Sequence, residues 1–204
     1  MNLTPDLILS AYCQGLFPMA DGRDGEIGWY SPDPRAIQPF VEGDPLGAFH
    51  IKRSLAKQLR KHNFEITTDR CFANVIHACA TEPRRDGEGT WISPHLEALY
   101  FELYEHGFAH SVEAWSEGEL VGGIYGVTIG SAFFGESMFS RQPYASQVCY
   151  AWLIEHLRSR GYTLFDVQFV NPHLLQFGVV EVPRDSYMAL LAEAIEADIT
   201  WADA

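Results

Sequence analysis

Residues 119 to 141, ELVGGIYGVTIGSAFFGESMFSR, limit what this chain can fold into more than any other stretch. Two apolar runs, Leu120–Val127 and Ala132–Met138, are separated only by Thr128–Ser131, which includes Gly130. Two runs of strand length around a short connection that contains glycine predict a β-hairpin. Because both runs are so apolar, we expect this hairpin at the centre of the protein.

The second run also carries polar residues, Glu136 and Ser137, among aromatic ones. A carboxylate buried without a partner is costly, so Glu136 must be paired inside the protein or face the positive charge of a ligand. Gly135 has no Cβ, which lets another backbone or a substrate approach closely. On these residues alone, a core strand with a glutamate near a turn and the wall of a binding site remain equally good interpretations.

Composition sets broad limits. The chain has 204 residues, of which 47% are hydrophobic, and this fits one large domain or a main domain with a small companion. No apolar run approaches the roughly 18 residues of a membrane-spanning helix. The first twenty residues have no basic segment, so they make a poor signal peptide. The cysteines form no CxxC pair, and we expect reduced thiols in a cytosolic protein.

The net charge of −13 argues against nucleic acid for the chain as a whole, but the positive charges are gathered in one place. No acid occurs between His50 and Asn63. Residues 54–61 have a helical pattern, and helical spacing places four basic residues on one face: Arg53, Lys57, Arg60 and Lys61. A solvated surface and a phosphate-binding face are both open interpretations of this pattern.

The order of elements predicts an α+β (mixed α/β) fold. A short N-terminal helix follows Thr4, and breaker residues at 41–47 suggest a boundary between a small N-terminal domain, 1–45, and a main domain, 46–204. The main domain has helices, then three strands joined by short turns as an antiparallel meander, then a helix over 145–160 and a strand over 162–170. Helix–strand–strand–strand–helix–strand order resembles the GNAT acyltransferase fold, whose members use acetyl-coenzyme A.

Asp166 and Gln168 lie two apart in the last of these strands, so their side chains point to the same face of the sheet. Alternation puts Leu164 on that polar face and Phe165, Val167 and Phe169 on the other. The sequence therefore predicts that Asp166 and Gln168 share a partly buried polar pocket.

Several chemistries lack their motifs. The histidines form no HxxxH or HxH pair, so we expect no metal. GxGxxG, GxxxxGK[ST] and GxSxG are all absent. GNAT enzymes have a [QR]xxGx[GA] pyrophosphate loop, but the matching residues 141–146, RQPYAS, lack the glycine, so coenzyme A is disfavoured.

With these pieces in place, the chain resembles the bacterial leucyl/phenylalanyl-tRNA–protein transferases. The matching blocks span nearly the whole chain, and GESMFSR followed by DxQ is highly specific. In order they are AY-Q-G-FP at 11–18, W-SPDPR at 29–35, TWIS at 90–93, G-AHSVE at 107–113, ELVGG-YGV at 119–127, FGESMFSR at 134–141, DVQ at 166–168, NPHL at 171–174 and FG-VEVPR at 177–184.

The resemblance implies transfer of Leu or Phe, and Met more weakly, from aminoacyl-tRNA to a protein with N-terminal Arg or Lys, which marks that protein for degradation. The tRNA ester is already activated, so no coenzyme A is needed. Gln168, polarised by Asp166, would sit at the attacking α-amine. Asp166 as direct base and relay through a tRNA hydroxyl both remain open as routes for the proton.

The resemblance also assigns binding residues. Glu136, beside Gly135 and Ser137, would pair with the basic side chain or α-ammonium of the acceptor. The apolar pocket for Leu or Phe would be formed by Met138, Leu153, Leu157, Phe165 and Phe169. Trp91 and Tyr100 would wall the site near the terminal adenosine, and the basic face would contact the acceptor stem. A monomer is expected on the same ground.

The chain departs from the family pattern in a few places. We expect it to lack the extension that many members have before the first helix, and Gln147 stands where a lysine is usual. Two rival functions remain: an acyltransferase of related fold that moves another aminoacyl group, and a tRNA-binding module without catalysis.

Overall fold

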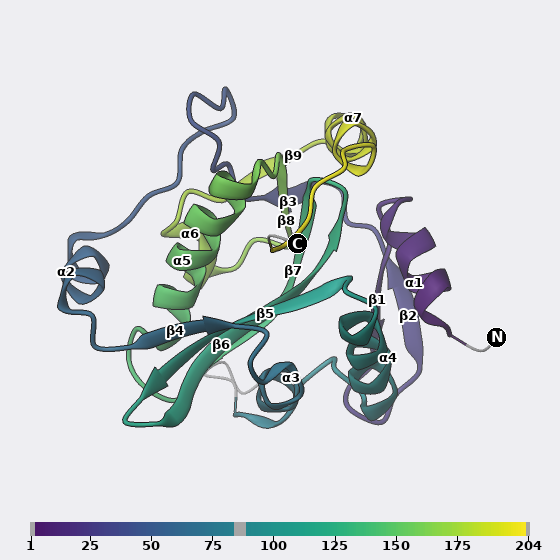
Figure 1. Cartoon of the computed structure of the whole chain (residues 1–204). Helices are drawn as coiled ribbons and strands as arrows, with labels where there is room; N and C mark the ends of the chain where they lie inside the picture. Colours follow the sequence, from purple (N-terminus) through teal and green to yellow (C-terminus); the bar gives the residue numbers. More distant parts are fainter. Residues whose placement is uncertain (1–2, 84–88, 203–204) are drawn as a thin grey trace.

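A seven-stranded sheet with the order β4–β5–β6–β7–β8–β3–β9 forms the middle of the protein (Figure 1). The computed structural model describes residues 3–83 and 89–202. Adjacent strands are antiparallel, except that β7 and β8 are parallel. The strands of this sheet are β3 (Arg35–Ile37), β4 (Glu65–Thr68), β5 (Ala109–Ser116), β6 (Glu119–Ile129), β7 (Ala132–Ser140), β8 (Leu164–Gln168) and β9 (Val180–Val182).

The remaining elements are helices and a small second sheet. The helices are α1 (Pro5–Tyr12), α2 (Arg53–Lys61), α3 (Phe72–Thr81), α4 (Pro94–Glu105), α5 (Ala145–Arg160), α6 (Pro172–Leu175) and α7 (Arg184–Ile195). Strands β1 (Phe17–Ala20) and β2 (Ile27–Tyr30) pair with each other. The predicted α+β class is confirmed, and so is the GNAT-like order, since two helices precede the β5–β6–β7 meander and α5 leads to the parallel strand β8.

The predicted central hairpin is formed by β6 and β7. Its turn contains Gly130, whose φ of 57° lies in the left-handed region. A Cβ at Gly130 would lie 2.3 Å from the Ala194 carbonyl oxygen, so glycine is needed both for the turn and for the packing of the end of α7. The meander is antiparallel throughout, as predicted.

Helix ends follow the local sequence. The Oγ1 atom of Thr4 accepts a hydrogen bond from the Leu7 amide at 3.3 Å, and the Oγ of Ser93 accepts one from the Leu96 amide at 3.2 Å. Proline follows both capping residues at the first helical position. Gly161 ends α5 with a φ of 81°.

Two apolar cores lie on the two faces of the sheet. One core holds residues of α1, α3, α4 and α7, and the other holds the buried face of α5 together with Leu55 of α2 (Figure 1). Leu164 belongs to the first core and Phe165 to the second, so β8 alternates between them. Within the described residues, helices that are both long and apolar enough to cross a bilayer do not occur.

Residues Arg35–Ile37 directly follow a proline-rich stretch. These residues form β3, which lies between β8 and β9. The prolines at 32 and 34 end just before the strand, so every residue of β3 keeps its amide hydrogen. The division at residue 45 stays a prediction, although β3 hydrogen-bonds within the large sheet.

Gly126 of β6 is packed closely against β7. A Cβ there would lie 2.3 Å from the Phe134 carbonyl oxygen and 2.4 Å from Cζ of Phe133. We expect Gly126→Ala to lower the free energy of unfolding by about 1–3 kcal/mol, because backbone and a buried ring would have to move. Gly89, with nothing within 4 Å of the same position, is the control for urea unfolding. Equal effects of the two substitutions would contradict the expectation.

Candidate active site

The candidate active site lies where β7 and β8 run side by side beneath α1 and α4. Phe134 of β7 is paired in parallel register with Asp166 of β8, which brings Glu136 to the level of Gln168. The side chains of Glu136, Asp166 and Gln168 are all buried, with exposed fractions of 8%, 0% and 6%. The predicted polar pocket on this face of β8 is thus a closed cluster.

Glu136 is the extra residue of a β-bulge. On the facing strand Tyr125 pairs with Ser137 and its neighbour Gly126 pairs with Gly135, so Glu136 has no partner in β6. A bulge changes the direction of the side chains that follow it, and bulges are common next to active sites. This one lets Glu136 point toward α1 and α4, whereas Met138 packs against the core on the opposite face.

Three side chains donate hydrogen bonds to the Glu136 carboxylate. Its Oε1 accepts from the Tyr12 hydroxyl at 2.6 Å and from Nε2 of Gln168 at 2.8 Å, and its Oε2 accepts from the Tyr100 hydroxyl at 2.9 Å. The two tyrosine oxygens are also 2.8 Å apart. Tyr12 and Tyr100 come from α1 and α4, so residues 88 positions apart meet on one acid.

Asp166 forms a buried ion pair with Arg35. The Arg35 side chain is 1% exposed, and its Nε and Nη2 donate to Oδ1 and Oδ2 of Asp166 at 2.9 and 2.6 Å. Its guanidinium lies between the rings of Phe17 and Tyr187, at 4.7 and 4.6 Å from their centroids. The Tyr187 hydroxyl donates to Oδ2 at 2.8 Å, so the Asp166 charge is fully compensated.

Gln168 joins the two acids. Its backbone amide donates to Oδ1 of Asp166 at 2.8 Å, while its side-chain Nε2 donates to Glu136. Its φ of 65° lies in the left-handed region, which is uncommon for a residue with a side chain and is frequent at functional sites. The bond to Asp166 holds this backbone conformation in place.

Glu136, its two tyrosine partners and Arg35 have shifted pKa values. Burial raises the pKa of Glu136 to about 7, although hydrogen bonds from Tyr12 and Tyr100 lower it. Burial, followed by the charge of Glu136, raises the pKa of both tyrosines well above its usual value, so both keep their protons. Burial lowers the pKa of Arg35, but the ion pair with Asp166 more than offsets this, and the pKa is raised.

The positive φ of Gln168 ends β8 and breaks the predicted alternation. Phe169 is predicted to share a face with Phe165, but its ring packs edge-on against Phe17, 5.7 Å away, on the other face. Phe169 is 45% exposed, whereas Phe165 is buried. The prediction for Phe169 fails because alternation holds only while the backbone stays extended.

The structure separates the predicted site residues into two groups. Glu136, Asp166, Gln168 and Tyr100 come together on one face, and Trp91 lies next to Tyr100, with ring centroids 6.5 Å apart. The predicted apolar pocket residues other than Phe169 pack on the opposite face of the sheet: Met138, Leu153, Leu157 and Phe165. Gly135 leaves room for the Phe165 ring, since a Cβ at Gly135 would lie 2.8 Å from that ring. Ser137 is half-buried.

Tyr12, Arg35 and Tyr187 belong to the cluster but are not among the predicted site residues. Tyr12 occupies an apolar position of an amphipathic helix, which by pattern is an ordinary core position. The only signal for Tyr12 and Arg35 is that they lie within the matching blocks 11–18 and 29–35. Tyr187 lies outside every block.

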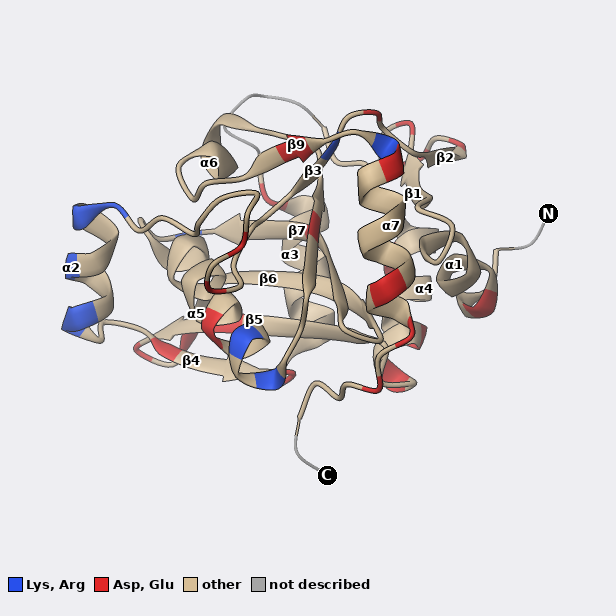
Figure 2. Ribbon diagram, turned by 90° about the horizontal axis from the view of Figure 1, so that it is seen from above, with Lys and Arg blue, Asp and Glu red and all other residues tan. Residues whose placement is uncertain are grey.

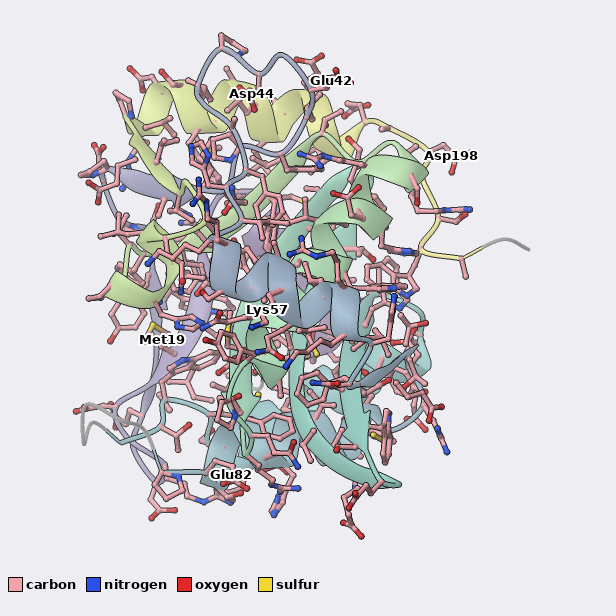
Figure 3. All side chains as sticks on the ribbon, turned by 90° about the vertical axis from the view of Figure 1, so that its left-hand side faces the viewer. Met19, Glu42, Asp44, Lys57, Glu82 and Asp198 are labelled. Carbon is pink, nitrogen blue, oxygen red and sulfur yellow. The ribbon has the colours of Figure 1, made fainter. Side chains whose placement is uncertain are left out.

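The predicted basic face of α2 is exposed. Arg53, Lys57, Arg60 and Lys61 are all exposed, while Leu55 and Leu59 pack against the core beneath α5. Across the described part of the chain, no acid lies within ion-pair distance of these four cations. Figure 2 shows the blue residues of α2 at one end of the molecule, and Figure 3 looks onto this helix with Lys57 labelled.

The order of helices and strands is that of the GNAT-like fold. Comparison with known proteins gives the family. The model of the leucyl/phenylalanyl-tRNA protein transferase family matches residues 45–192, and the model of that family's N-terminal domain matches residues 1–33. This chain belongs to the leucyl/phenylalanyl-tRNA protein transferase family.

Curated relatives are similar to this chain over almost its full length. The leucyl/phenylalanyl-tRNA–protein transferase of Salinibacter ruber is 46% identical over 200 residues, which cover 98% of this chain and 84% of the relative. That of Akkermansia muciniphila is 48% identical over 195 residues, which cover 96% of this chain and 97% of the relative.

Solved structures are only distantly similar. L-PGS from Bacillus licheniformis is 12% identical with a TM-score of 0.46 and covers 95% of this chain and 71% of its own. A GCN5-related N-acetyltransferase-like protein from Streptococcus suis is 16% identical with a TM-score of 0.33. The match covers 93% of this chain and 61% of that protein.

Proposed function

We propose that this protein transfers Leu or Phe, and Met more weakly, from aminoacyl-tRNA to the α-amino group of proteins that begin with Arg or Lys, and so marks them for degradation. The observation that carries the proposal is the family match over residues 1–33 and 45–192. Its most specific blocks, FGESMFSR and DVQ, supply Glu136, Asp166 and Gln168 of one buried cluster. The donor is already an activated ester, so we include neither coenzyme A nor a metal. The protein acts as a monomer in this proposal.

The chemistry is aminolysis of an ester. The α-amine of the acceptor attacks the carbonyl carbon, and the ribose oxygen of the tRNA leaves. Because Nε2 of Gln168 donates to Glu136, Oε1 of Gln168 is free to accept a hydrogen bond from the attacking amine. Gln168 is thus the residue that orients the amine, and Asp166 positions Gln168 through its backbone amide.

Glu136 is 8% exposed and already accepts bonds from Tyr12, Tyr100 and Gln168. As the family resemblance implies, the negative charge of the buried Glu136 attracts the basic acceptor. For the donor, the half-buried Met138 contacts the core that contains Leu153, Leu157 and Phe165. These residues lie on the opposite face of the sheet from Gln168, so we place the donor side chain beside Phe169 and Trp91, on the face that carries Gln168.

The function is tested by transfer of labelled Phe from Phe-tRNA to a peptide beginning with Arg, beside the same peptide beginning with Ala. We expect transfer to the Arg peptide only. Equal transfer to both peptides would overturn the acceptor rule. Salt-sensitive binding of tRNA without any transfer would overturn the enzymatic function and favour a tRNA-binding module.

The basic face of α2 is proposed to bind phosphates of the tRNA acceptor stem. Replacing Lys57 and Arg60 by Ala should raise the KM for aminoacyl-tRNA and reduce the slope of log K against log salt by about 1 for each phosphate that is no longer bound. The kcat should change little, because α2 is remote from Gln168. The control is Arg70→Ala, since Arg70 is exposed but paired with Glu65 at 3.1 Å. An equal change in slope for Arg70→Ala would show that α2 has no special role.

A further inference from the structure

Aminolysis requires a place for the proton that leaves the amine, and two carboxylates contact Gln168. This inference rests on the proposed function. The amide of Gln168 is itself a weak base, so the proton must continue to a stronger one. The contacts of Asp166 and Glu136 differ in a way that decides between them.

Four donor groups already occupy the two carboxylate oxygens of Asp166. Its Oδ1 accepts from Nε of Arg35 and from the Gln168 amide, and its Oδ2 accepts from Nη2 of Arg35 and the hydroxyl of Tyr187. Protonation would leave the buried guanidinium without its counter-charge, in a site closed to water. Its link to Gln168, moreover, goes to the backbone amide and not to the side chain.

Glu136 has room for one proton. Glu136, Tyr12 and Tyr100 form a ring of three short contacts, of 2.6, 2.9 and 2.8 Å. With Glu136 ionised, the ring contains only the two hydroxyl protons, so one of the three oxygen–oxygen contacts has none. A proton on Oε1 of Glu136 supplies the third: Oε1 donates to Tyr12, Tyr12 to Tyr100, and Tyr100 to Oε2.

Gln168 connects this ring to the substrate. Its Nε2 is 2.8 Å from Oε1 of Glu136, so one end of the amide contacts the proton acceptor. The other end, Oε1, faces the position proposed for the attacking amine. The amide group is therefore a bridge between the amine and the ring.

We propose that the Glu136 carboxylate, within its ring with Tyr12 and Tyr100, is the base that holds a proton while the new C–N bond forms, and that the side-chain amide of Gln168 connects it to the attacking amine. As the nitrogen bonds to the carbonyl carbon, one amine proton moves to Oε1 of Gln168 and one Nε2 proton moves to Glu136. Gln168 becomes its imidic acid form.

The second half of the step restores both residues. When the ester C–O bond breaks, its electron pair leaves with the ribose oxygen, which takes the proton from Oε1 of Gln168. Glu136 returns a proton to Nε2 at the same time. The amine proton thus ends on the tRNA hydroxyl, and neither an oxidant nor a further reactant is consumed.

The charges around Glu136 allow this exchange near neutral pH. Tyr12 faces Glu136 from α1, Tyr100 from α4, Asp166 from β8 and Arg35 from β3. Burial has the largest effect on the pKa of Glu136 and raises it to about 7. Below that pH the ring already holds its proton and cannot accept another. Transfer should therefore rise with pH through about 7.

The test is the pH dependence of single-turnover transfer between about pH 5 and pH 9, with saturating Phe-tRNA and Arg peptide. The acceptor amine also titrates in this range, so the informative quantity is the difference between wild type and Glu136→Gln with one peptide. Wild type should show two ionisations on the acid side and Glu136→Gln only one, with a rate lower by about 100-fold. Tyr100→Phe removes a bond that lowers the pKa of Glu136, so its acid limb should move to higher pH.

Glutamine suits position 136, because its amide supplies the third proton of the ring and should fold well. The stability of the same two proteins gives a readout that needs no activity. Since the pKa of Glu136 is raised on folding from 4.5 to about 7, the folded state binds more protons than the unfolded state between these values. The wild-type free energy of unfolding should therefore fall, relative to Glu136→Gln, as pH rises from about 4.5 to about 7.

Each result decides the matter. A stability difference that does not change with pH would mean that Glu136 never holds a proton, and would overturn the relay even if transfer is normal. Two acid ionisations retained in Glu136→Gln would overturn it as well. A titrating Glu136 in a wild-type protein that transfers nothing would overturn the proposed function, and the relay with it. The paired loss of one ionisation and of the stability change supports the proposal.

Discussion

Replacing Arg35 by methionine is expected to lower the free energy of unfolding by about 3–5 kcal/mol, measured by urea unfolding at neutral pH. The reason is the charge left behind. Asp166 is 0% exposed, and without the guanidinium its carboxylate would stay buried with only the Tyr187 hydroxyl and the Gln168 amide as donors. The substitution also removes the bond from Arg35 to the Gly15 carbonyl at 3.0 Å, which ties the segment after α1 to β3.

Two further variants separate the charge effect from poorer packing. Arg35→Met combined with Asp166→Leu removes both charges and should recover part of the stability, since apolar pairs often replace buried ion pairs at little cost. Arg70→Met breaks an exposed pair with Glu65 and should cost at most about 1 kcal/mol. If Arg35→Met were no more damaging than Arg70→Met, the buried pair would not be a main support of the fold.

Replacing Gln168 by glycine should nearly abolish transfer while leaving the protein as stable as before. The kcat should fall by at least about 100-fold, because the amide that contacts the amine and Glu136 is gone. The free energy of unfolding should change by less than about 1 kcal/mol. Glycine adopts the φ of 65° without strain, and this offsets the removal of the hydrogen bond to Glu136.

The matched control is Glu117→Gly in the exposed turn between β5 and β6, where φ is 53°. It should relieve similar strain and leave transfer unchanged. Thermal unfolding and single-turnover transfer on both variants provide the comparison. A Gln168→Gly protein that still transfers Phe at a wild-type rate would remove Gln168 from the mechanism, and with it the positioning role of Asp166.

Much of the fold is predictable because the patterns that specify it are local. The β6–β7 hairpin follows from two apolar runs around Gly130, and the starts of α1 and α4 follow from Thr4 and Ser93, each before a proline. The shared direction of Asp166 and Gln168 follows from the two-residue period of a strand. Each of these patterns involves residues only a few positions apart.

The site is less predictable because its contacts are distant in sequence. Arg35 and Asp166 are separated by 131 positions, and Tyr12 and Glu136 by 124. Tyr12 looks like a core residue until its hydroxyl meets Glu136. The one-residue bulge at Glu136 and the positive φ of Gln168 leave no mark in the alternation, which is why Phe169 is placed on the wrong face.

The sequence by itself determined the class of elements, the central hairpin, the family and the polar residues of its specific motifs. Only the tertiary structure decided what those residues do to one another: Asp166 is neutralised by Arg35, whereas Glu136 is left with room for a proton. The physical reason is that proton affinity depends on burial and on the donors around each carboxylate. Those surroundings exist only after α1, α4, β3 and β8 have packed together.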